Sequence, residues 1–324
     1  MTPELAAVER VEILTLQDNY IDLTSGDGSA VVQRAIPLKG DQVSVSLLAE
    51  HGFSALVRVH AAGKVRSLLF DFGFSQHGAA FNADALGIDL RQVEALALSH
   101  GHMDHTGGLE ALSQRIARPG ITLTLHPEAY RTPRYMKLGE SFKAYFPPLT
   151  RERIDAAGIT VQESSQPRLL LDETILFLGQ IPRRTDFEKG APNLCCEKDG
   201  VEMPDSFEDD TALVMHLKDK GLVVLSGLRP RGDHQHGAPC PGGDRRRPSP
   251  CGDGRISSFR SGQAGSDPAH GGGHGGHRAR LRDPDPLHRP RGGSGLRTGP
   301  APGLHPQHER HANGFRLKIV VYAA

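Results

Sequence analysis

The amino-acid composition of this 324-residue chain changes abruptly after Gly227, and that change limits which part can form a packed core. Residues 228–324 contain 19 Gly and 12 Pro among 97 residues, with 16 basic and 7 acidic residues for a net charge of +9. Residues 1–227 carry 22 basic and 31 acidic residues, a net charge of −9. A segment so poor in apolar side chains cannot offset the entropy lost on folding. The sequence therefore predicts one domain over residues 10–227 and a disordered tail over 228–324.

Simple sequence features argue against several classes of protein. No apolar run approaches the roughly 18 residues of a membrane span, and residues 1–10 lack the basic and apolar regions of a signal peptide. The net charge of the whole chain is zero, so a nucleic-acid partner is not favoured. Four cysteines do not make a disulfide framework in a chain this long, so Cys195 and Cys196 are expected to be free thiols rather than a disulfide or a metal pair. We expect a cytoplasmic protein without a membrane partner.

Hydrophobic periodicity predicts many strands and few helices. Helices are expected near residues 82–86 and over 109–116, and the segment 128–145 is expected to be helical or irregular. Strands on both sides of a few helices favour an α/β sandwich over a strictly alternating Rossmann unit. The expected strands are 11–16, 43–48, 54–60, 67–70, 95–98, 121–125, 159–161, 168–171, 175–178, 212–217 and 222–225.

Three histidines and one aspartate lie within six residues, directly after the apolar segment 95–98. Such a composition is typical of metal ligands, and loops at the ends of buried strands commonly carry functional residues. His100 and His102, two residues apart on extended backbone, can face one metal, while Asp104 and His105 can face a second. Two cations about 4 Å apart can act together on one substrate oxygen. The alternative, a solvated polar loop, fits this composition poorly.

The loop sequence SHGHMDHTGG at 99–108 resembles the H-x-H-x-D-H signature of the metallo-β-lactamase superfamily. Other strings narrow the resemblance to a subgroup of metal-dependent hydrolases that includes dihydropterin–ribofuranosylaminobenzene-phosphate synthase. They are LLFDFG at 68–73, EHG at 50–52, GQIPR at 179–183, TDFE at 185–188 and DDTAL at 209–213. The resemblance covers residues 10–227. It implies an α/β fold of the αββα sandwich type, with two zinc ions (Zn²⁺).

The same resemblance implies a role for each residue of the loop. His100 and His102 are expected to hold the first metal. Asp104 and His105 are expected to hold the second, with Asp104 also orienting the water that attacks the substrate. The implied substrate is a small molecule, either phosphorylated or related to a pterin.

Five further residues are considered outside the loop. Asp71 is a candidate to contact a metal ligand rather than the metal itself. Arg183, with Arg184, is a candidate clamp for a substrate phosphate, although a solvated turn is the favoured alternative. His126 precedes Pro127 and is expected to be structural rather than a ligand, and the role of His51 is left open.

The resemblance stops after Leu225-Ser226-Gly227. In the family, a histidine for the first metal follows in a string like C-A-H-A-G, and one for the second metal lies in P-T-H-C-T-G. Here the next residues are LRPRGDHQHG. One permitted coding of residues 228–237, read one base later, gives C-A-H-A-G-I-I-N-T. The same shifted frame permits M-G-G-F-H-L-S-G over 253–262 and P-T-H-C-T-G over 284–290.

Three family motifs, in order and in one frame, indicate a one-base insertion near the codons of Gly227 and Leu228. The present chain is then a frame-disrupted enzyme, with the alternative of a catalytically dead remnant that binds at most one metal weakly. Other interpretations of the tail are an Arg/Gly-rich nucleic-acid-binding arm, a metal-binding arm at His270, His274 and His277, or replacement of a lost ligand by His234 or His236. Because the tail has two Phe and one Tyr for stacking on bases, we favour non-native sequence.

Overall fold

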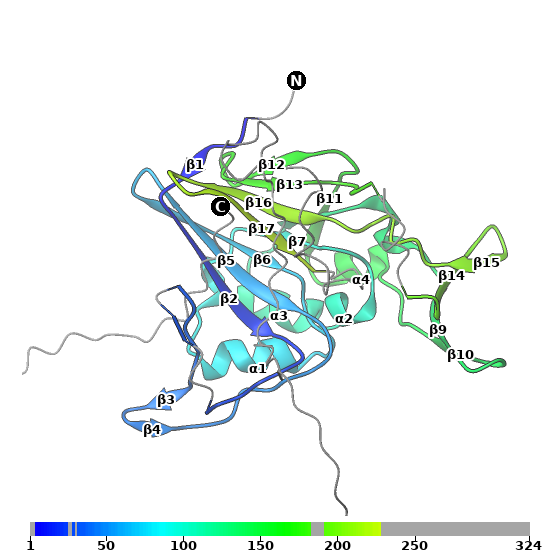
Figure 1. Ribbon diagram of the computed structural model, residues 1–324, viewed down its shortest axis with the longest axis horizontal. Helices are drawn as coiled ribbons and strands as arrows, with labels where there is room; N and C mark the ends of the chain where they lie inside the picture. The colour runs from blue at the N-terminus through cyan, green and yellow to red at the C-terminus, as the bar shows by residue number, and fades with distance from the viewer. Residues whose placement is uncertain (1–3, 25–27, 30, 183–190, 228–324) are drawn as a thin grey trace, which may run out of the picture. The chain divides into compact units, whose positions relative to one another are not determined.

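Two β-sheets pack face to face at the centre of the described chain (Figure 1). The computed structural model of this protein describes residues 4–24, 28–29, 31–182 and 191–227. The first sheet has six strands in the order β11-β8-β7-β6-β5-β2. In chain order they are β2 (Arg10–Gln17), β5 (Ser54–Ala61), β6 (Lys64–Phe70), β7 (Ala95–Ala97), β8 (Ile121–Leu125) and β11 (Ile159–Glu163).

The second sheet has five strands, with β1-β16-β13-β12 in order and β17 paired to β16. They are β1 (Ala7–Val8), β12 (Arg168–Leu170), β13 (Ile175–Phe177), β16 (Ala212–Leu217) and β17 (Gly221–Ser226). A smaller sheet extends to one side in the order β10-β9-β14-β15 (Figure 1). It contains β9 (Arg134–Leu138), β10 (Phe142–Tyr145), β14 (Leu194–Lys198) and β15 (Val201–Pro204). A short hairpin joins β3 (Leu38–Lys39) to β4 (Gln42–Val43).

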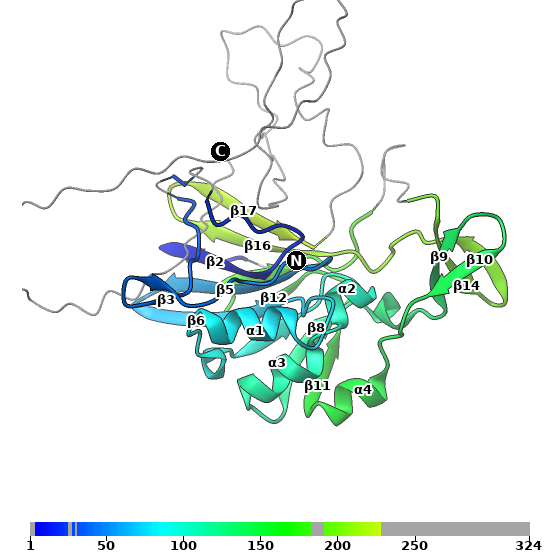
Figure 2. The same ribbon diagram turned by 90° about the horizontal axis from the view of Figure 1, so that it is seen from below.

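The helices α1, α3 and α4 lie together on one side of the six-stranded sheet (Figure 2). The α-helices are α1 (Gly78–Ala85), α2 (Met103–Thr106), α3 (Leu109–Ile116) and α4 (Arg151–Ala156). Two 3₁₀ turns, η1 (Leu90–Gln92) and η2 (Pro127–Tyr130), precede β7 and follow β8. Within the described ranges, no helix has the length and apolar character needed to span a bilayer.

The six-stranded sheet is buried on both faces, and β2 shows how the sequence achieves this. Side chains alternate along a strand, so Val11 and Ile13 face the second sheet, where they pack in the core with residues such as Phe177 and Met215. Leu14 and Leu16 belong to the other core, between this sheet and the helices. The strand is therefore buried along most of its length, including the polar side chains of Glu12 and Gln17.

The expected α/β sandwich is confirmed, and α3 spans residues 109–116 as predicted. Two local predictions are wrong. The segment 128–145 contains one turn of 3₁₀ helix and then the hairpin β9–β10, which is stabilised by pairing with the distant strand β14. The alternating segment 43–48 is strand only at Val43, because it has no paired neighbour beyond the hairpin with β3. The predictions for the tail, 228–324, lie outside the described residues.

Candidate metal centre

The histidine-rich loop begins where β7 ends, at the edge of the sheet. Strand β7 runs parallel to β6 and β8, and the loop then enters the short helix α2. The backbone of this loop is fixed at close range, because a Cβ on Gly101 would lie 1.9 Å from the carbonyl oxygen of Ala129. A Cβ on Gly107 would lie 1.6 Å from the carbonyl oxygen of Phe74. Only glycine permits such close approaches, so these two glycines determine how closely the loop packs against Ala129 and Phe74.

The loop brings the side chains of His100, Asp104 and His105 to one point. Each can offer one ligand atom, and these atoms all lie within 4.8 Å of one another. The ring of His102 is next to them, with its centroid 4.8 Å from that of His100. The three imidazoles are almost completely buried, whereas Asp104 is partly exposed. Three of the four residues predicted from the sequence therefore meet at one point, and the ring of His102 lies beside His100.

Asp71, at the end of β6, contacts the loop from behind. Its Oδ1 accepts a hydrogen bond from the backbone N–H of Ser99 at 2.7 Å, and its Oδ2 accepts one from the Ser99 hydroxyl at 2.7 Å. The same Oδ2 lies 2.7 Å from Nδ1 of His105, and Ser99 Oγ lies 3.0 Å from Nδ1 of His100. Both rings are therefore held at Nδ1, and Nε2 of His105 lies 3.4 Å from Oδ2 of Asp104, the other candidate ligand.

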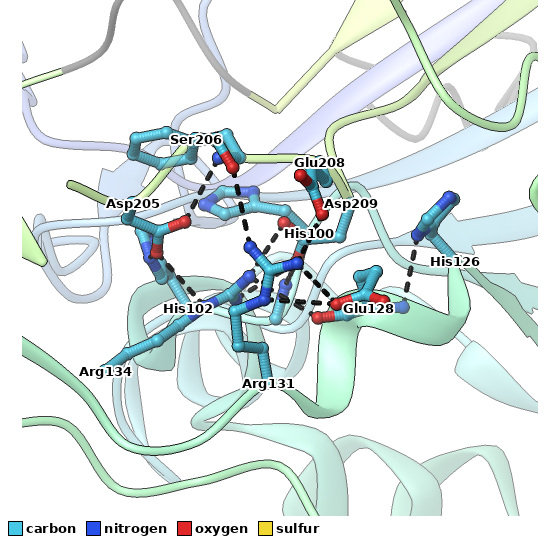
Figure 3. A network of polar contacts seen from close by, with 12 residues as sticks. His100, His102, His126, Glu128, Arg131, Arg134, Asp205, Ser206, Glu208 and Asp209 are labelled. Atoms are coloured by element: carbon cyan, nitrogen blue, oxygen red, sulfur yellow. Dashed lines mark hydrogen bonds and ion pairs between the residues drawn. The ribbon is translucent and has the colours of Figure 1, made fainter. Parts of the chain in front are cut away.

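The ring of His102 has the opposite orientation. Its Nε2 lies 2.9 Å from Oδ2 of Asp205, so Nδ1 is the nitrogen left for a metal ion (Figure 3). Metal-binding histidines commonly donate their second ring N–H to a carboxylate, which fixes the ring and its tautomer. The sequence analysis did not identify Asp205, which lies 103 residues beyond His102 in the chain.

The electrostatic field of this site favours positive charge. Burial disfavours the charged form of His105, yet the carboxylates of Asp104 and Asp71 raise its pKa to about 10. Burial also disfavours the carboxylate of Asp104, but His105, with the charges of His102 and His51, lowers the pKa of Asp104 well below its usual value. Buried carboxylates around three imidazoles form a donor set that suits Zn²⁺.

Arg134, the first residue of β9, lies near His102 and Asp205 (Figure 3). It donates two hydrogen bonds to Asp209, at 2.8 and 3.0 Å, and its Nε forms an ion pair with Asp205 at 3.1 Å. Asp209 also accepts a hydrogen bond from the backbone N–H of Gly101 at 2.8 Å. Asp209 belonged to a string that resembles the family, but neither it nor Arg134 was assigned a role from the sequence.

The remaining sequence candidates have separate positions. The exposed ring of His51 lies 3.4 Å from Asp104. His126 caps η2, with its Nδ1 accepting the backbone N–H of Glu128, which is a structural role. Cys195 and Cys196 are free and buried in β14, as predicted. Arg183 and Arg184 lie outside the described residues, so the clamp and the solvated turn both stay predictions.

Comparison with known proteins extends these observations. The family model of the metallo-β-lactamase superfamily matches residues 49–182. The chain is 27% identical, over 236 residues covering 70% of each protein, to the 7,8-dihydropterin-6-methyl-4-(β-D-ribofuranosyl)-aminobenzene-5′-phosphate synthase of Methanocaldococcus jannaschii. An uncharacterized protein of the same organism is 27% identical over 180 residues, 54% of this chain and 62% of that one. Among solved structures, Tm1679, described as a metal-dependent hydrolase of the β-lactamase superfamily, is 26% identical, with 69% and 68% of the two chains covered and a TM-score of 0.48.

The matched segment 49–182 contains the histidine loop, Asp71 and the strands that position them. The polar network of this loop and the mixed α/β sandwich agree with that match. Over residues 49–182 this chain is therefore similar to the metallo-β-lactamase superfamily, and its histidine loop lies inside that matched segment.

Proposed function

We propose that this protein derives from a zinc-dependent hydrolase or synthase that acts on a small substrate. The observation that carries the proposal is the arrangement of the three imidazoles. Each has one ring nitrogen held by a protein oxygen, which fixes the orientation of the ring. Solvated surface histidines have no need to be buried and held in this way. The donor set of imidazole nitrogens and a carboxylate is the one that Zn²⁺ takes in hydrolytic enzymes.

Each residue of the site would have a distinct role. His100 and His102 would hold one zinc ion, and Asp104 with His105 the second. A bound zinc ion acts as a Lewis acid and makes water a stronger nucleophile at neutral pH. Asp104, the least buried of the four, would accept a hydrogen bond from the attacking water and orient it. Asp71 and Asp205 would keep the rings of His105 and His102 in place.

The substrate is proposed from the relative that covers 70% of this chain, a synthase whose name describes a phosphorylated dihydropterin compound. A small phosphorylated or pterin-related molecule is therefore the first substrate class to test. Arg183 is the residue we propose to contact the phosphate. A nucleic-acid partner is not part of this proposal.

We also propose that the present chain is frame-disrupted after Gly227, and that its own activity is low as a result. Gly227 supports this, because a Cβ there would lie 2.1 Å from Ser99 Oγ and 2.5 Å from Asp71 Oδ2. Strand β17 thus ends directly beside the candidate metal centre. A histidine three residues later, as in the shifted reading C-A-H, would be well placed to reach the first metal. The present chain has Pro230 at that position.

The test is metal analysis of the purified chain after incubation with zinc and removal of the excess. We expect fewer than two zinc ions per chain and little hydrolysis of small phosphoesters, because incomplete ligand sets bind metal weakly. The double variant His100→Ala with His105→Ala should lose the remaining zinc. Two stoichiometric zinc ions in the present chain would contradict the frame disruption. Equal zinc content in the double variant would contradict the metal centre itself.

A further inference from the structure

We propose that Arg134 is a positioning residue for the metal centre, acting through Asp205 and Asp209. The proposal rests on the proposed metal site but concerns residues that neither the family match nor the sequence analysis assigns to it. Arg134 contacts no candidate ligand directly. It holds the two carboxylates that fix His102 and the backbone between His100 and His102 (Figure 3).

Arg134 and Asp205 together fix the ring of His102. Arg134 Nε and Asp205 Oδ2 are 3.1 Å apart, and the same oxygen lies 2.9 Å from Nε2 of His102. Asp205 is further held by the backbone N–H of Phe207, which donates to its Oδ1 at 3.0 Å. Phe207 and Phe146 pack on the His102 ring, with centroids 4.9 and 5.6 Å away. The imidazole is thus restrained at its Nε2 edge and against two aromatic rings.

Arg134 and Asp209 together fix the backbone at Gly101. The two terminal nitrogens of Arg134 donate to the two oxygens of Asp209, at 3.0 and 2.8 Å. Asp209 Oδ2 also accepts the N–H of Gly101, the residue between the two histidines. A planar guanidinium gives this bidentate contact a fixed geometry that a lysine ammonium does not reproduce.

Stability alone gives a poor reason for this network. The side chains of Arg134, Asp205 and Asp209 are 3%, 1% and 0% exposed. Burying charges so completely costs desolvation energy that their attraction roughly offsets, so such networks often add little to stability. What the network does provide is a fixed position for His102 and Gly101, which metal binding requires.

The test compares three variants of the full chain: Arg134→Lys, Asp209→Asn and the control Arg66→Lys. Arg66 is also partly buried in ion pairs, with Glu94 and Asp172, but these contact no metal candidate. Three quantities are measured: the affinity for Co²⁺ from its visible spectrum, the hydrogen-exchange rate of the Gly101 amide, and the ¹⁵N shifts of the His102 ring. The last two need no metal, and the ring shifts report on the protonation of His102 rather than on overall stability.

We expect Arg134→Lys to weaken Co²⁺ binding about 10- to 100-fold, with faster exchange at Gly101 and a changed proton distribution on the His102 ring. The control should change none of these. If Arg134→Lys fails to fold, Asp209→Asn carries the test through Gly101 exchange and Co²⁺ affinity. Variants that match the control in all three quantities would overturn the proposal. Absence of Co²⁺ binding in every chain, including the unsubstituted one, would contradict the proposed metal centre, while Gly101 and His102 would still decide the role of Arg134.

Discussion

Asp71 Oδ2 lies 2.7 Å from Nδ1 of His105, and the backbone of Asp71 is held at a φ of 60° to achieve it. Few residues other than glycine adopt this left-handed conformation, although aspartate and asparagine tolerate it. The carboxylate is completely buried and also accepts both hydrogen bonds from Ser99. One side chain therefore connects the ends of β6 and β7 to a metal-ligand candidate.

Replacing Asp71 with Asn should separate the role of the carboxylate from that of the backbone. Asparagine keeps the size and tolerates the positive φ, but its NH₂ group cannot accept the hydrogen bonds that Oδ2 accepts. Hydrogen bonds to a charged group contribute about 1.5–3 kcal/mol each, so we expect the free energy of unfolding to fall by about 3 kcal/mol. Chemical denaturation measures this, and zinc content should fall with it. Asp172→Asn is the control, since Asp172 has a φ of 53° but an exposed side chain. Equal stability of the two variants would refute the role of Asp71.

Replacing Gly227 with Ala tests how closely the end of β17 approaches the metal centre. The added carbon would meet Ser99 Oγ and Asp71 Oδ2, both buried and both engaged. Because these atoms cannot move without losing their hydrogen bonds, we expect a loss of about 1–3 kcal/mol, typical of overpacking. The control is Gly28→Ala, where the nearest atom is 3.6 Å away. Thermal unfolding of the two variants gives the comparison, and a Gly227→Ala protein as stable as its control would show that this approach is not tight.

The loop was predictable from the sequence because its ligands are neighbours. His100, His102, Asp104 and His105 fall within six residues, so composition alone reveals them. Asp205 and Arg134 could not be found this way. They meet His102 and Asp209 only after β9 and the segment before β16 have come together, and no single-sequence pattern encodes that contact.

The helices and strands show the same difference between local and distant signals. Helix α3 and strand β8 have strong local periodicity, and the sequence predicts both. The strands β9 and β10 are short and carry Arg and Lys between apolar residues, so they have no clear alternation of their own. Pairing of β9 with β14, about 60 residues away, stabilises the β9–β10 hairpin as part of a sheet.

The two cysteines of β14 should react slowly with a thiol reagent in the folded protein. Cys195 and Cys196 are 4% and 0% exposed, and burial raises the pKa of the Cys196 thiol, so little reactive thiolate forms. Alkylation followed by peptide mass mapping should find both sites unmodified in buffer and fully modified in denaturant. Cys240 and Cys251, on separate peptides, provide an internal comparison. Rapid modification of Cys196 in buffer would contradict its burial in β14.

Deleting one base at the boundary between the Gly227 and Leu228 codons should repair the enzyme. The restored frame is expected to read C-A-H-A-G directly after Gly227, followed by M-G-G-F-H-L-S-G and P-T-H-C-T-G. It would add histidine ligands for both metals beside Ser99 and Asp71, which Gly227 already approaches.

The restored segment would also cover the five-stranded sheet. Strand β16 has the nearly continuous apolar sequence ALVMHL, typical of a strand covered on both faces. Val214 of β16 and Val224 of β17 lie on the outer side of this sheet, in a cluster apart from the core between the sheets. None of the described helices α1 to α4 contributes to that cluster. We expect the repaired protein to be more soluble, to unfold cooperatively at a higher temperature and to bind two zinc ions. Sequencing of the DNA at this boundary, zinc analysis and calorimetry of both proteins measure these outcomes. An early stop codon in the repaired frame, or a repaired protein with no gain in stability or zinc, would show that the tail is genuine.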